Sequence, residues 1–439
     1  MLLCWSARSA SAQVGSWRSY TSMREVTALS ASGDAVWVGT TGGIYRYTTA
    51  TGEIKRYTNI EGLHAPDVAA LTFDAGCGAA GCVWIGYDDG VIDRLDVDAG
   101  AVTTFRDLQR ADRYPSRTIN RMVLNGDSLL IATAFGLVVF DKSRSEVRDT
   151  YDQIGNAPPA MPIYDATVAE GPDGGAALWL ATEQGVGYAY LRSPNLKDPA
   201  AWTVETSGLP SPQVLSLAAF QNVLYVGTAL GPARRDAGGT YTALPVTDWP
   251  VLSLESTPEG LLGLDQFAVL VMDGNGAFSR FPLPGVENPV DVALTGDTVW
   301  VGDRAVGLVP ARLDRNGPPK LTALQDCQVA QNTCYPAGPY SGIFVDLDVD
   351  GMGNLWAAGV SEAGSGFHRL DLEGEWTDFT GAAMPLLQGR SSFTRVYAAP
   401  DGNLWAASEG NGLVQVTPDG EVTVYTRDNS TLRASEGIS

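Results

Sequence analysis

Few residues in this 439-residue sequence could act as nucleophiles, general bases or metal ligands. It has two histidines, His64 in an "EGLHAPDV" segment and His368 in a "GFHRLD" strand. A Ser-His-Asp or Cys-His nucleophile and a histidine-ligated metal each need a histidine beside its partners. We therefore expect both histidines to be structural or surface residues, and we predict no catalytic residue, no cofactor and no metal site.

Two acidic motifs have a competing structural explanation. "DLDVDGMGN", with Asp346, Asp348 and Asp350, begins like an EF-hand calcium loop, but its twelfth position is Ala357 instead of a bidentate Glu. The adjacent carboxylates of "GYDDG" at residues 86–90 could be proposed as a catalytic pair, although Asp is common in turns. The pattern favours a strand and turn over calcium binding in the first motif, and a turn in the second.

The cysteines form two local pairs after Cys4 is set aside. Cys77 and Cys82 bound "CGAAGC", and Cys327 and Cys334 bound "CQVAQNTC". An even number of cysteines in two tight loops favours two short-range disulfides and an oxidising compartment. The alternative is one four-thiolate zinc site, which this spacing suits poorly.

The net charge is −21, and the acidic residues are spread along the chain. This predicts a large soluble surface and argues against nucleic acid as a partner. Asp exceeds Glu, and the only lysines are Lys55, Lys142, Lys197 and Lys320. Adaptation to high salt and a GC-rich genome both remain explanations for this bias.

The first residues, "MLLCWSARSASAQ", end in the small-x-small pattern Ala10-Ser11-Ala12. We interpret residues 1–12 as the remnant of an export signal cleaved before Gln13. An unstructured cytosolic N-terminus is the alternative. No run of about 18 apolar residues occurs, so we expect no transmembrane helix. The predicted location is the periplasm or the outer cell surface.

A repeated unit organises the chain. Phrases like "VWVGTTGGIYRYT" recur with an apolar alternation before them and two further short strands after them. The second residues of these phrases are Trp37, Trp84, Leu130, Trp179, Tyr225, Leu262, Trp300, Trp356 and Trp405. Units of four short antiparallel strands, about 40 to 50 residues long, are typical of β-propeller blades. The sequence therefore predicts an all-β propeller protein.

The spacing of the units suggests two propellers. The longest interval, between Trp300 and Trp356, contains Pro- and Gly-rich linker sequence. We predict a seven-bladed propeller over residues 16–325 and the first two blades of a truncated second propeller over 335–439. "SWRSYTS" at residues 16–22 looks like an orphan outer strand, which we expect to complete the last blade of the first ring.

The sequence assigns packing or binding roles by position in the unit. The aromatic anchors Trp37, Trp84, Trp179, Tyr225, Trp300, Trp356 and Trp405 are expected to pack between blades, with Gly or Ala two residues later leaving space. Turns between second and third strands share one face of a propeller. The candidate ligand-binding residues on that face are Thr41, Asp88, Asp89, Phe135, Glu183, Gln184 and Arg304, with Phe135 as an exposed aromatic. Ordinary solvated turns are the alternative.

Particular phrases resemble known families. "SGLPSPQVLSL" at 207–217 and "DGNLWAAS" at 401–408 resemble two-component-regulator propeller repeats. "SWRSYTS", "DDGVIDRLD" and "EVRDTYDQIG" occur in an order similar to that of the PorZ-like propeller proteins of the type IX secretion system. The second resemblance implies an exported protein without a catalytic centre, in a surface complex that attaches cargo to anionic lipopolysaccharide.

The function predicted from the sequence is a non-enzymatic binding or scaffold component of such a complex. Its expected partners are proteins and surface glycan, including lipopolysaccharide. The alternative is the extracytoplasmic sensor propeller of a two-component regulatory system. An enzyme such as a lyase or glycosidase would need a cluster of reactive side chains at one mouth of the channel, and the scarcity of histidine weighs against it.

Overall fold

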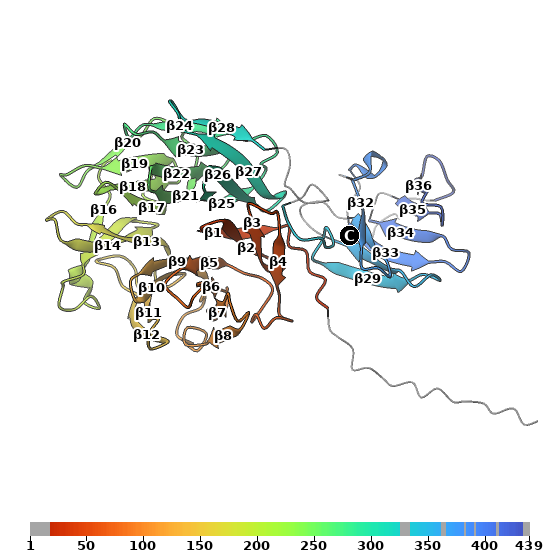
Figure 1. The fold of residues 1–439 in the computed structure, drawn as a ribbon, viewed down its shortest axis with the longest axis horizontal. Coiled ribbons are helices and arrows are strands. Elements are labelled where there is room, and N and C mark those ends of the chain that lie inside the picture. The colour runs from red at the N-terminus through yellow and green to blue at the C-terminus, as the bar shows by residue number, and fades with distance from the viewer. Residues whose placement is uncertain are drawn as a thin grey trace, which may run out of the picture.

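The computed structural model describes residues 18–324, 334–360, 366–381, 383–389, 392–409 and 412–432. These residues form nine four-stranded antiparallel sheets, each in simple chain order (Figure 1). The only helical elements among them are two 3₁₀ turns, η1 (Pro199–Ala201) and η2 (Pro385–Leu387). The predicted all-β class and four-stranded antiparallel unit are confirmed.

Sheets 1 to 7 are numbered in chain order. Their strands are β1 (Val26–Ser32), β2 (Ala35–Thr40), β3 (Gly43–Thr48) and β4 (Ile54–Tyr57); β5 (Ala70–Asp74), β6 (Cys82–Gly86), β7 (Ile92–Asp96) and β8 (Val102–Phe105); β9 (Ile119–Asn125), β10 (Ser128–Thr133), β11 (Gly136–Asp141) and β12 (Glu146–Tyr151); β13 (Ile163–Glu170), β14 (Ala176–Thr182), β15 (Gly185–Tyr190) and β16 (Thr203–Glu205); β17 (Val214–Phe220), β18 (Val223–Thr228), β19 (Gly231–Arg235) and β20 (Tyr241–Ala243); β21 (Val251–Thr257), β22 (Gly260–Asp265), β23 (Ala268–Met272) and β24 (Phe278–Pro282); β25 (Pro289–Thr295), β26 (Thr298–Asp303), β27 (Gly307–Asp314) and β28 (Lys320–Ala323).

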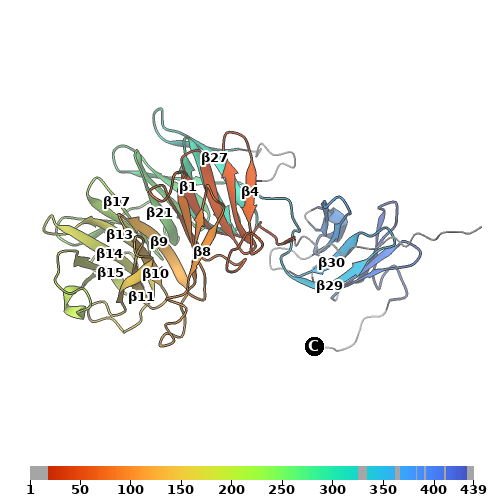
Figure 2. The ribbon, with the colours of Figure 1, turned by 60° about the horizontal axis from the view of Figure 1, so that its bottom comes forward.

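Sheets 8 and 9 follow a linker and lie to one side of the first seven (Figure 2). Their strands are β29 (Phe344–Val349), β30 (Leu355–Gly359), β31 (Gly366–Leu370) and β32 (Trp376–Thr380); β33 (Phe393–Ala398), β34 (Leu404–Ser408), β35 (Gly412–Val416) and β36 (Val422–Tyr425). The two sheets share one hydrophobic cluster, so each covers a face of the other.

The Thr-x-x-Gly phrase is a turn with its own hydrogen bonds. Thr40 Oγ1 donates to the Gly43 carbonyl oxygen at 2.8 Å and accepts from the Gly42 N–H at 3.0 Å. Gly43 has φ +130°, and a Cβ there would lie 2.5 Å from the Tyr57 carbonyl oxygen, so the position requires glycine. The same Thr-to-Gly hydrogen bond recurs at Thr133 to Gly136, Thr182 to Gly185 and Thr228 to Gly231. The phrase recurs because it builds the turn between second and third strands.

Each pair of neighbouring sheets is joined by a hydrophobic cluster. Trp37 of sheet 1, for example, packs in one cluster with Leu71 and Val83 of sheet 2. Burial of this kind is needed because a four-stranded sheet alone has too little core to be stable. Among the aromatic anchors, those buried are Trp37, Trp84, Trp179, Tyr225, Trp300 and Trp356, while Trp405 is half-buried.

The first strands of sheets 1 to 7 lie side by side in sequence order, and β25 also contacts β1. Trp300 of sheet 7 packs against Tyr47 of sheet 1, with ring centroids 5.1 Å apart. Asp291 Oδ2 accepts the Leu29 N–H of β1 at 3.0 Å. A Cβ at Gly302 would lie 2.6 Å from Val26, which shows how closely the two sheets approach.

The expectation for "SWRSYTS" is wrong over the part that the structure describes. Residues 18–22 form no strand, because the chain's own β28 already occupies the outer position of sheet 7. The segment instead contacts the region beyond the linker. Ser22 Oγ donates to the Tyr340 carbonyl oxygen at 3.3 Å, and the ring of Tyr20 lies 6.0 Å from that of Trp376.

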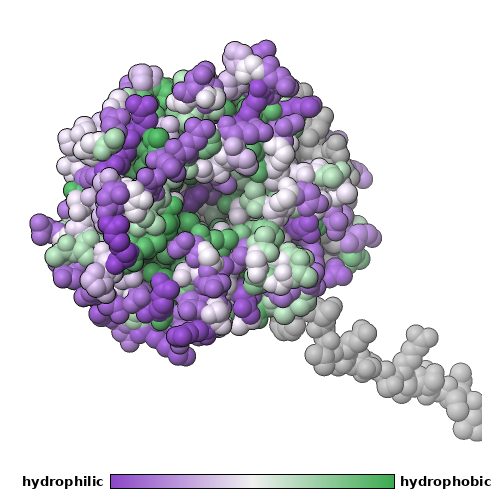
Figure 3. All heavy atoms as spheres, turned by 60° about the vertical axis from the view of Figure 1, so that its left-hand side comes forward, coloured by the Kyte–Doolittle hydropathy of each residue, from purple (hydrophilic) through white to green (hydrophobic). Residues whose placement is uncertain are grey.

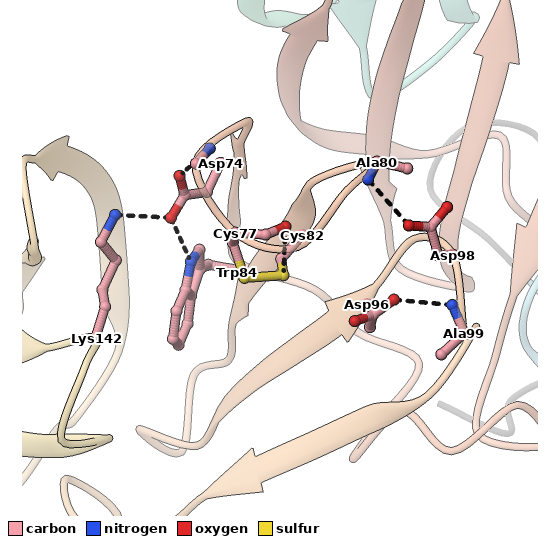
Figure 4. Close-up of a disulfide and its surroundings, with 10 residues drawn as sticks. Asp74, Cys77, Ala80, Cys82, Trp84, Asp96, Asp98, Ala99 and Lys142 are labelled. Carbon is pink, nitrogen blue, oxygen red and sulfur yellow. Dashed lines mark hydrogen bonds and ion pairs between the residues drawn. A yellow bond between two sulfur atoms is a disulfide. The ribbon is translucent and has the colours of Figure 1, made fainter.

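The disulfide predicted between Cys77 and Cys82 is present (Figure 4). It closes the hairpin before Trp84, whose indole Nε1 lies 3.4 Å from Asp74 Oδ2. Lys142 of sheet 3 donates to the same Asp74 oxygen at 2.7 Å, so this buried carboxylate joins sheets 2 and 3. Cys334 is buried and disulfide-bonded, while its predicted partner, Cys327, lies outside the described residues.

We expect Trp300→Ala to lower the free energy of unfolding by about 3–5 kcal/mol, because the substitution empties the cluster between sheets 7 and 1. Guanidinium denaturation followed by tryptophan fluorescence and circular dichroism measures the change. Leu372→Ala is the control, because Leu372 is 73% exposed. Equal stability of the two variants would contradict contact between these sheets.

Selective reduction of the Cys77–Cys82 disulfide, or its replacement by two alanines, should reduce stability by about 2 kcal/mol. The physical reason is the entropy that the unfolded hairpin regains once its short loop is no longer closed. Differential scanning calorimetry with and without reductant measures this. An unchanged melting temperature would show that the bond adds nothing to the folded state.

Candidate functional site

A cavity of about 570 Å³ opens where the inner ends of sheets 1 to 7 meet. Three of the predicted ligand-binding residues line it: Thr41 from the β2–β3 turn, Asp88 from the β6–β7 turn and Arg304 from the β26–β27 turn. Glu25 and Asp67, from the segments that lead into β1 and β5, line it as well. We call this cavity the mouth.

The carboxylates at the mouth outnumber its one cation. Glu25, Asp67 and Asp88 face Arg304 across the same cavity. Partial burial raises the pKa of Asp67, the negative charge of Asp88 raises it further, and Arg304 opposes both effects. The mouth therefore has an excess of negative charge at neutral pH.

The mouth leads into a deeper cavity of about 320 Å³, which we call the channel. Both cavities are lined by Thr27, Asn120, Tyr164, Leu215, Leu252 and Val290. Figure 3 shows a face of the molecule that is hollowed at its centre, with strongly hydrophilic residues at the bottom and hydrophobic ones around them.

A charged cluster lies in the channel. The guanidinium of Arg121 is 3.2 Å from Asp291 Oδ1 and 3.7 Å from Asp165 Oδ1. Asp165 also accepts the Leu217 N–H of the next sheet at 2.9 Å, and Ser253 Oγ donates to Asp291 at 2.7 Å. The charge of Asp291 raises the pKa of Arg121 against the effect of burial, so the arginine stays cationic. Both aspartates thus serve as structural bridges between sheets.

Glu255 is the third carboxylate of the channel, and it has no hydrogen bond or ion pair within the part of the chain that the structure describes. Its residue is half-buried inside the channel. Burial raises the pKa of Glu255 to about 7, with Asp291 and Asp165 raising it and Arg121 lowering it.

The other predicted ligand-binding residues do not line the mouth. Asp89 Oδ2 accepts from His64 Nε2 at 2.9 Å and from Gln109 Nε2 at 2.7 Å, which fixes it within its turn. Phe135 is buried and stacks on Tyr114 at 3.9 Å between ring centroids, so its expected exposure is wrong. Glu183 and Gln184 are exposed on the β14–β15 turn.

Exposed apolar side chains near this face were missed by the sequence interpretation. Leu230 occupies the β18–β19 turn and is 58% exposed. Trp249, in the segment before β21, packs edge-on against Phe267 of the β22–β23 turn at 4.9 Å. Leu230 and Phe267 hold the same turn position as the predicted ligand-binding residues. That position could have identified them from the sequence. The exposure of Trp249 could not be read from the pattern.

The remaining chemical candidates have structural partners. His368 is fully buried, with Nδ1 2.7 Å from Asp378 Oδ1. Asp346 accepts the Val396 N–H, and Asp350 accepts the Asn354 N–H and the Trp356 indole N–H. Within the described ranges, no three His, Cys, Asp or Glu side chains lie close enough together to hold a metal ion. No described helix has the length and apolar character needed to cross a membrane.

Comparison with protein families gives a match. Residues 36–203 match the family model described as "TSS9, PorZ, N-terminal beta-propeller domain". Over these residues, the chain is similar to the N-terminal β-propeller domain of PorZ. The predicted PorZ-like resemblance is therefore confirmed. Among curated proteins, none matches this sequence.

Solved structures agree with this at the level of the fold. PorZ of Porphyromonas gingivalis, described as an essential bacterial surface component of the type-IX secretion system, matches with a TM-score of 0.77 and 20% identity. The match covers 95% of this chain and 54% of PorZ, so the chain spans about half the length of that relative.

Two extracellular domains from B. thetaiotaomicron match less well. That of a putative one component system has a TM-score of 0.38 and 13% identity, over 92% of this chain and 61% of its own. That of a putative hybrid two component system has a TM-score of 0.38 and 14% identity, over 96% and 66%. The PorZ-like description thus rests on the family match and the PorZ structure.

Glu255→Gln should stabilise the protein at pH 8 by about 2 kcal/mol, because the parent carboxyl is then ionised beside Asp165 and Asp291. Stability from the neutral Glu255 carboxyl is fully present below its ordinary pKa of 4.5 and is lost as pH rises through about 7. The difference between variant and parent should therefore vanish near pH 4.5. Melting temperatures from pH 4.5 to 8 test this, with exposed Glu183→Gln as control, and a pH-independent difference would contradict it.

Proposed function

We propose that this protein is a non-enzymatic, exported binding component of a type IX secretion complex at the cell surface. The observation that carries the proposal is the match of residues 36–203 to the PorZ N-terminal propeller domain. The Cys77–Cys82 disulfide supports it, because such bonds persist in oxidising compartments outside the cytoplasm.

We infer the architecture on which this function depends. Residues 16–325 form one seven-bladed propeller, and residues 335–439 contain two blades of a second. The contact between β25 and β1 supports closure after seven sheets. The separate cluster shared by sheets 8 and 9 supports the boundary between the two units. A closed ring has a fixed central channel, which suits a rigid scaffold.

The absence of catalysis in this proposal is supported by the structural roles of Asp165, Asp291 and Asp89. Asp165 and Asp291 hold backbone N–H groups of neighbouring sheets, and Asp89 is held by His64 and Gln109. A general base must be free to reach a substrate proton. Carboxylates that are already hydrogen-bonded to the scaffold fit a structural role better.

The proposed binding face is the mouth with its exposed apolar neighbours. It presents the carboxylates of the mouth. Exposed Leu230 and Phe267 lie in turns between second and third strands, as Thr41 and Arg304 do, and Trp249 packs on Phe267. Exposed aromatic side chains next to a polar cavity are typical of protein interaction sites. Partner proteins of the secretion complex are the ligands that we propose for this face. Surface glycan, including lipopolysaccharide, is a second proposed ligand of the protein, without an assigned site.

Tagged parent protein, expressed in its native host and cross-linked in intact cells, should copurify with identified type IX secretion components from the envelope fraction. The Trp249→Ala/Phe267→Ala double variant should recover those components at least about tenfold less well, because large aromatic contacts dominate many interfaces. Leu372→Ala, on sheet 8, is the matched exposed control.

Mass spectrometry identifies the captured proteins, and a lipopolysaccharide immunoblot of the same eluate tests the glycan. Recovery of the protein only from the cytosol, or from an envelope fraction without secretion components, would refute the proposed function. Recovery of the same components with the double variant would show that the binding face does not depend on Trp249 and Phe267.

A further inference from the structure

We propose that the mouth and channel bind an organic cation, the ammonium or guanidinium group of a Lys or Arg side chain on a partner protein. This inference deepens the proposed function, because it names the chemistry of the partner at the proposed binding face. It rests on the charge of the cavity walls, the unpaired Glu255 and the apolar lining that separates the acidic groups.

The walls carry a large excess of negative charge. The carboxylates that line the two cavities are Glu25, Asp67, Asp88, Asp165, Glu255 and Asp291. Against these six stand Arg304 at the mouth and Arg121 in the channel. The Arg121 guanidinium lies between Asp165 and Asp291 and also acts on Glu255, so one cation stands against the three carboxylates of the channel. A concave wall of one sign raises the local concentration of the opposite ion.

The lack of a partner for the Glu255 carboxyl group is a second observation, distinct from the number of carboxylates. This carboxyl group lines the channel and has no hydrogen-bond or ion-pair partner among the described residues. A partly buried ionised carboxylate is costly unless a cation, a donor or water pairs with it. The raised pKa of Glu255 reflects that cost. A cation that reached Glu255 would favour its ionised form and bring its pKa down.

The lining matches a long cationic side chain better than a bare metal ion. No described group of three carboxylate, histidine or cysteine residues is placed for metal binding. Leu215, Leu252 and Val290 line both cavities, so an aliphatic stem could pack along them while its charged end reaches Glu255. Tyr164 and Asn120 lie on the same wall and offer hydrogen-bond acceptors.

The same charges disfavour an anionic ligand at this cavity. Phosphate groups of a glycolipid would meet the three carboxylates Asp67, Asp88 and Glu25 against the single cation Arg304, and like charges at short range repel. Lipopolysaccharide, if it binds this protein, should therefore bind outside the mouth. Cation binding at the mouth and glycan binding by this protein would then use different residues, so different variants would test them.

Isothermal titration calorimetry of the whole chain with acetylated, amidated hexalysine and hexaarginine peptides tests the inference at 20 and 150 mM NaCl. Hexaglutamate and inorganic phosphate are the anionic probes. We expect saturable one-site binding of the cationic peptides, weakened at higher salt, and no binding of the anionic probes.

Matched variants locate the site. Glu255→Gln and Asp67→Asn/Asp88→Asn should each weaken hexaarginine binding at least about tenfold, and Glu183→Gln, which removes an exposed carboxylate outside both cavities, should leave it within about twofold. Arg304→Gln should strengthen binding several-fold, a gain that a misfolded variant cannot imitate. Equal affinity for the parent and all four variants, or preferential binding of phosphate, would overturn the inference.

Copurification of cross-linked partners from the envelope fraction distinguishes this inference from the proposed function. If secretion components are captured and no cationic peptide binds the mouth, the inference fails and the proposed function stands. If the peptides bind as expected and no secretion component is captured, the inference stands and the proposed function fails. Loss of both would refute each independently.

Discussion

The contact between sheet 7 and sheet 1 is the constraint on which the rest of the structure depends. Trp300 packs on Tyr47, and Asp291 accepts the backbone N–H of Leu29, so residues about 250 positions apart in the chain share one core. Without this contact, sheet 1 and sheet 7 would each expose an apolar face to water, at a free-energy cost that rises with the exposed area. The sheets between them gain their burial from neighbours on both sides.

The same contact creates the candidate site. The inner strands carry side chains that bridge neighbouring sheets, such as Ser30 Oγ, which accepts the Phe73 N–H, and Asn120 Nδ2, which donates to the Ile163 carbonyl oxygen. Asp165 and Asp291 make such bridges as ions, and Arg121 compensates their charge. The Glu255 carboxyl group takes part in none of these bridges. The acidic channel that we propose to bind a cation is therefore a consequence of how the sheets are held together.

Local patterns in the sequence predicted the repeating parts of the fold, because they are built by short-range interactions. The turn glycines follow from the backbone geometry at Gly43, and the buried apolar anchor of sheets 1 to 8 follows from strand alternation. The role of residues 18–22 was predicted wrongly because the partner of a strand is a long-range property. Phe135 was assigned to the surface by its turn position, although Tyr114, from a distant loop, covers it. Burial and the charges of Asp291 and Asp165 raise the pKa of Glu255, and no local pattern places these residues beside it.

A double-mutant cycle between Trp300 and Tyr47 is the most direct test of the central claim that sheet 7 closes onto sheet 1. The stabilities of Trp300→Ala, Tyr47→Ala and the double variant are compared with that of the parent by equilibrium denaturation. Because the two rings are in contact, the account predicts a coupling free energy of about 1 kcal/mol. Additivity of the two single effects, within about 0.3 kcal/mol, would mean that the two sheets do not meet and would contradict the account.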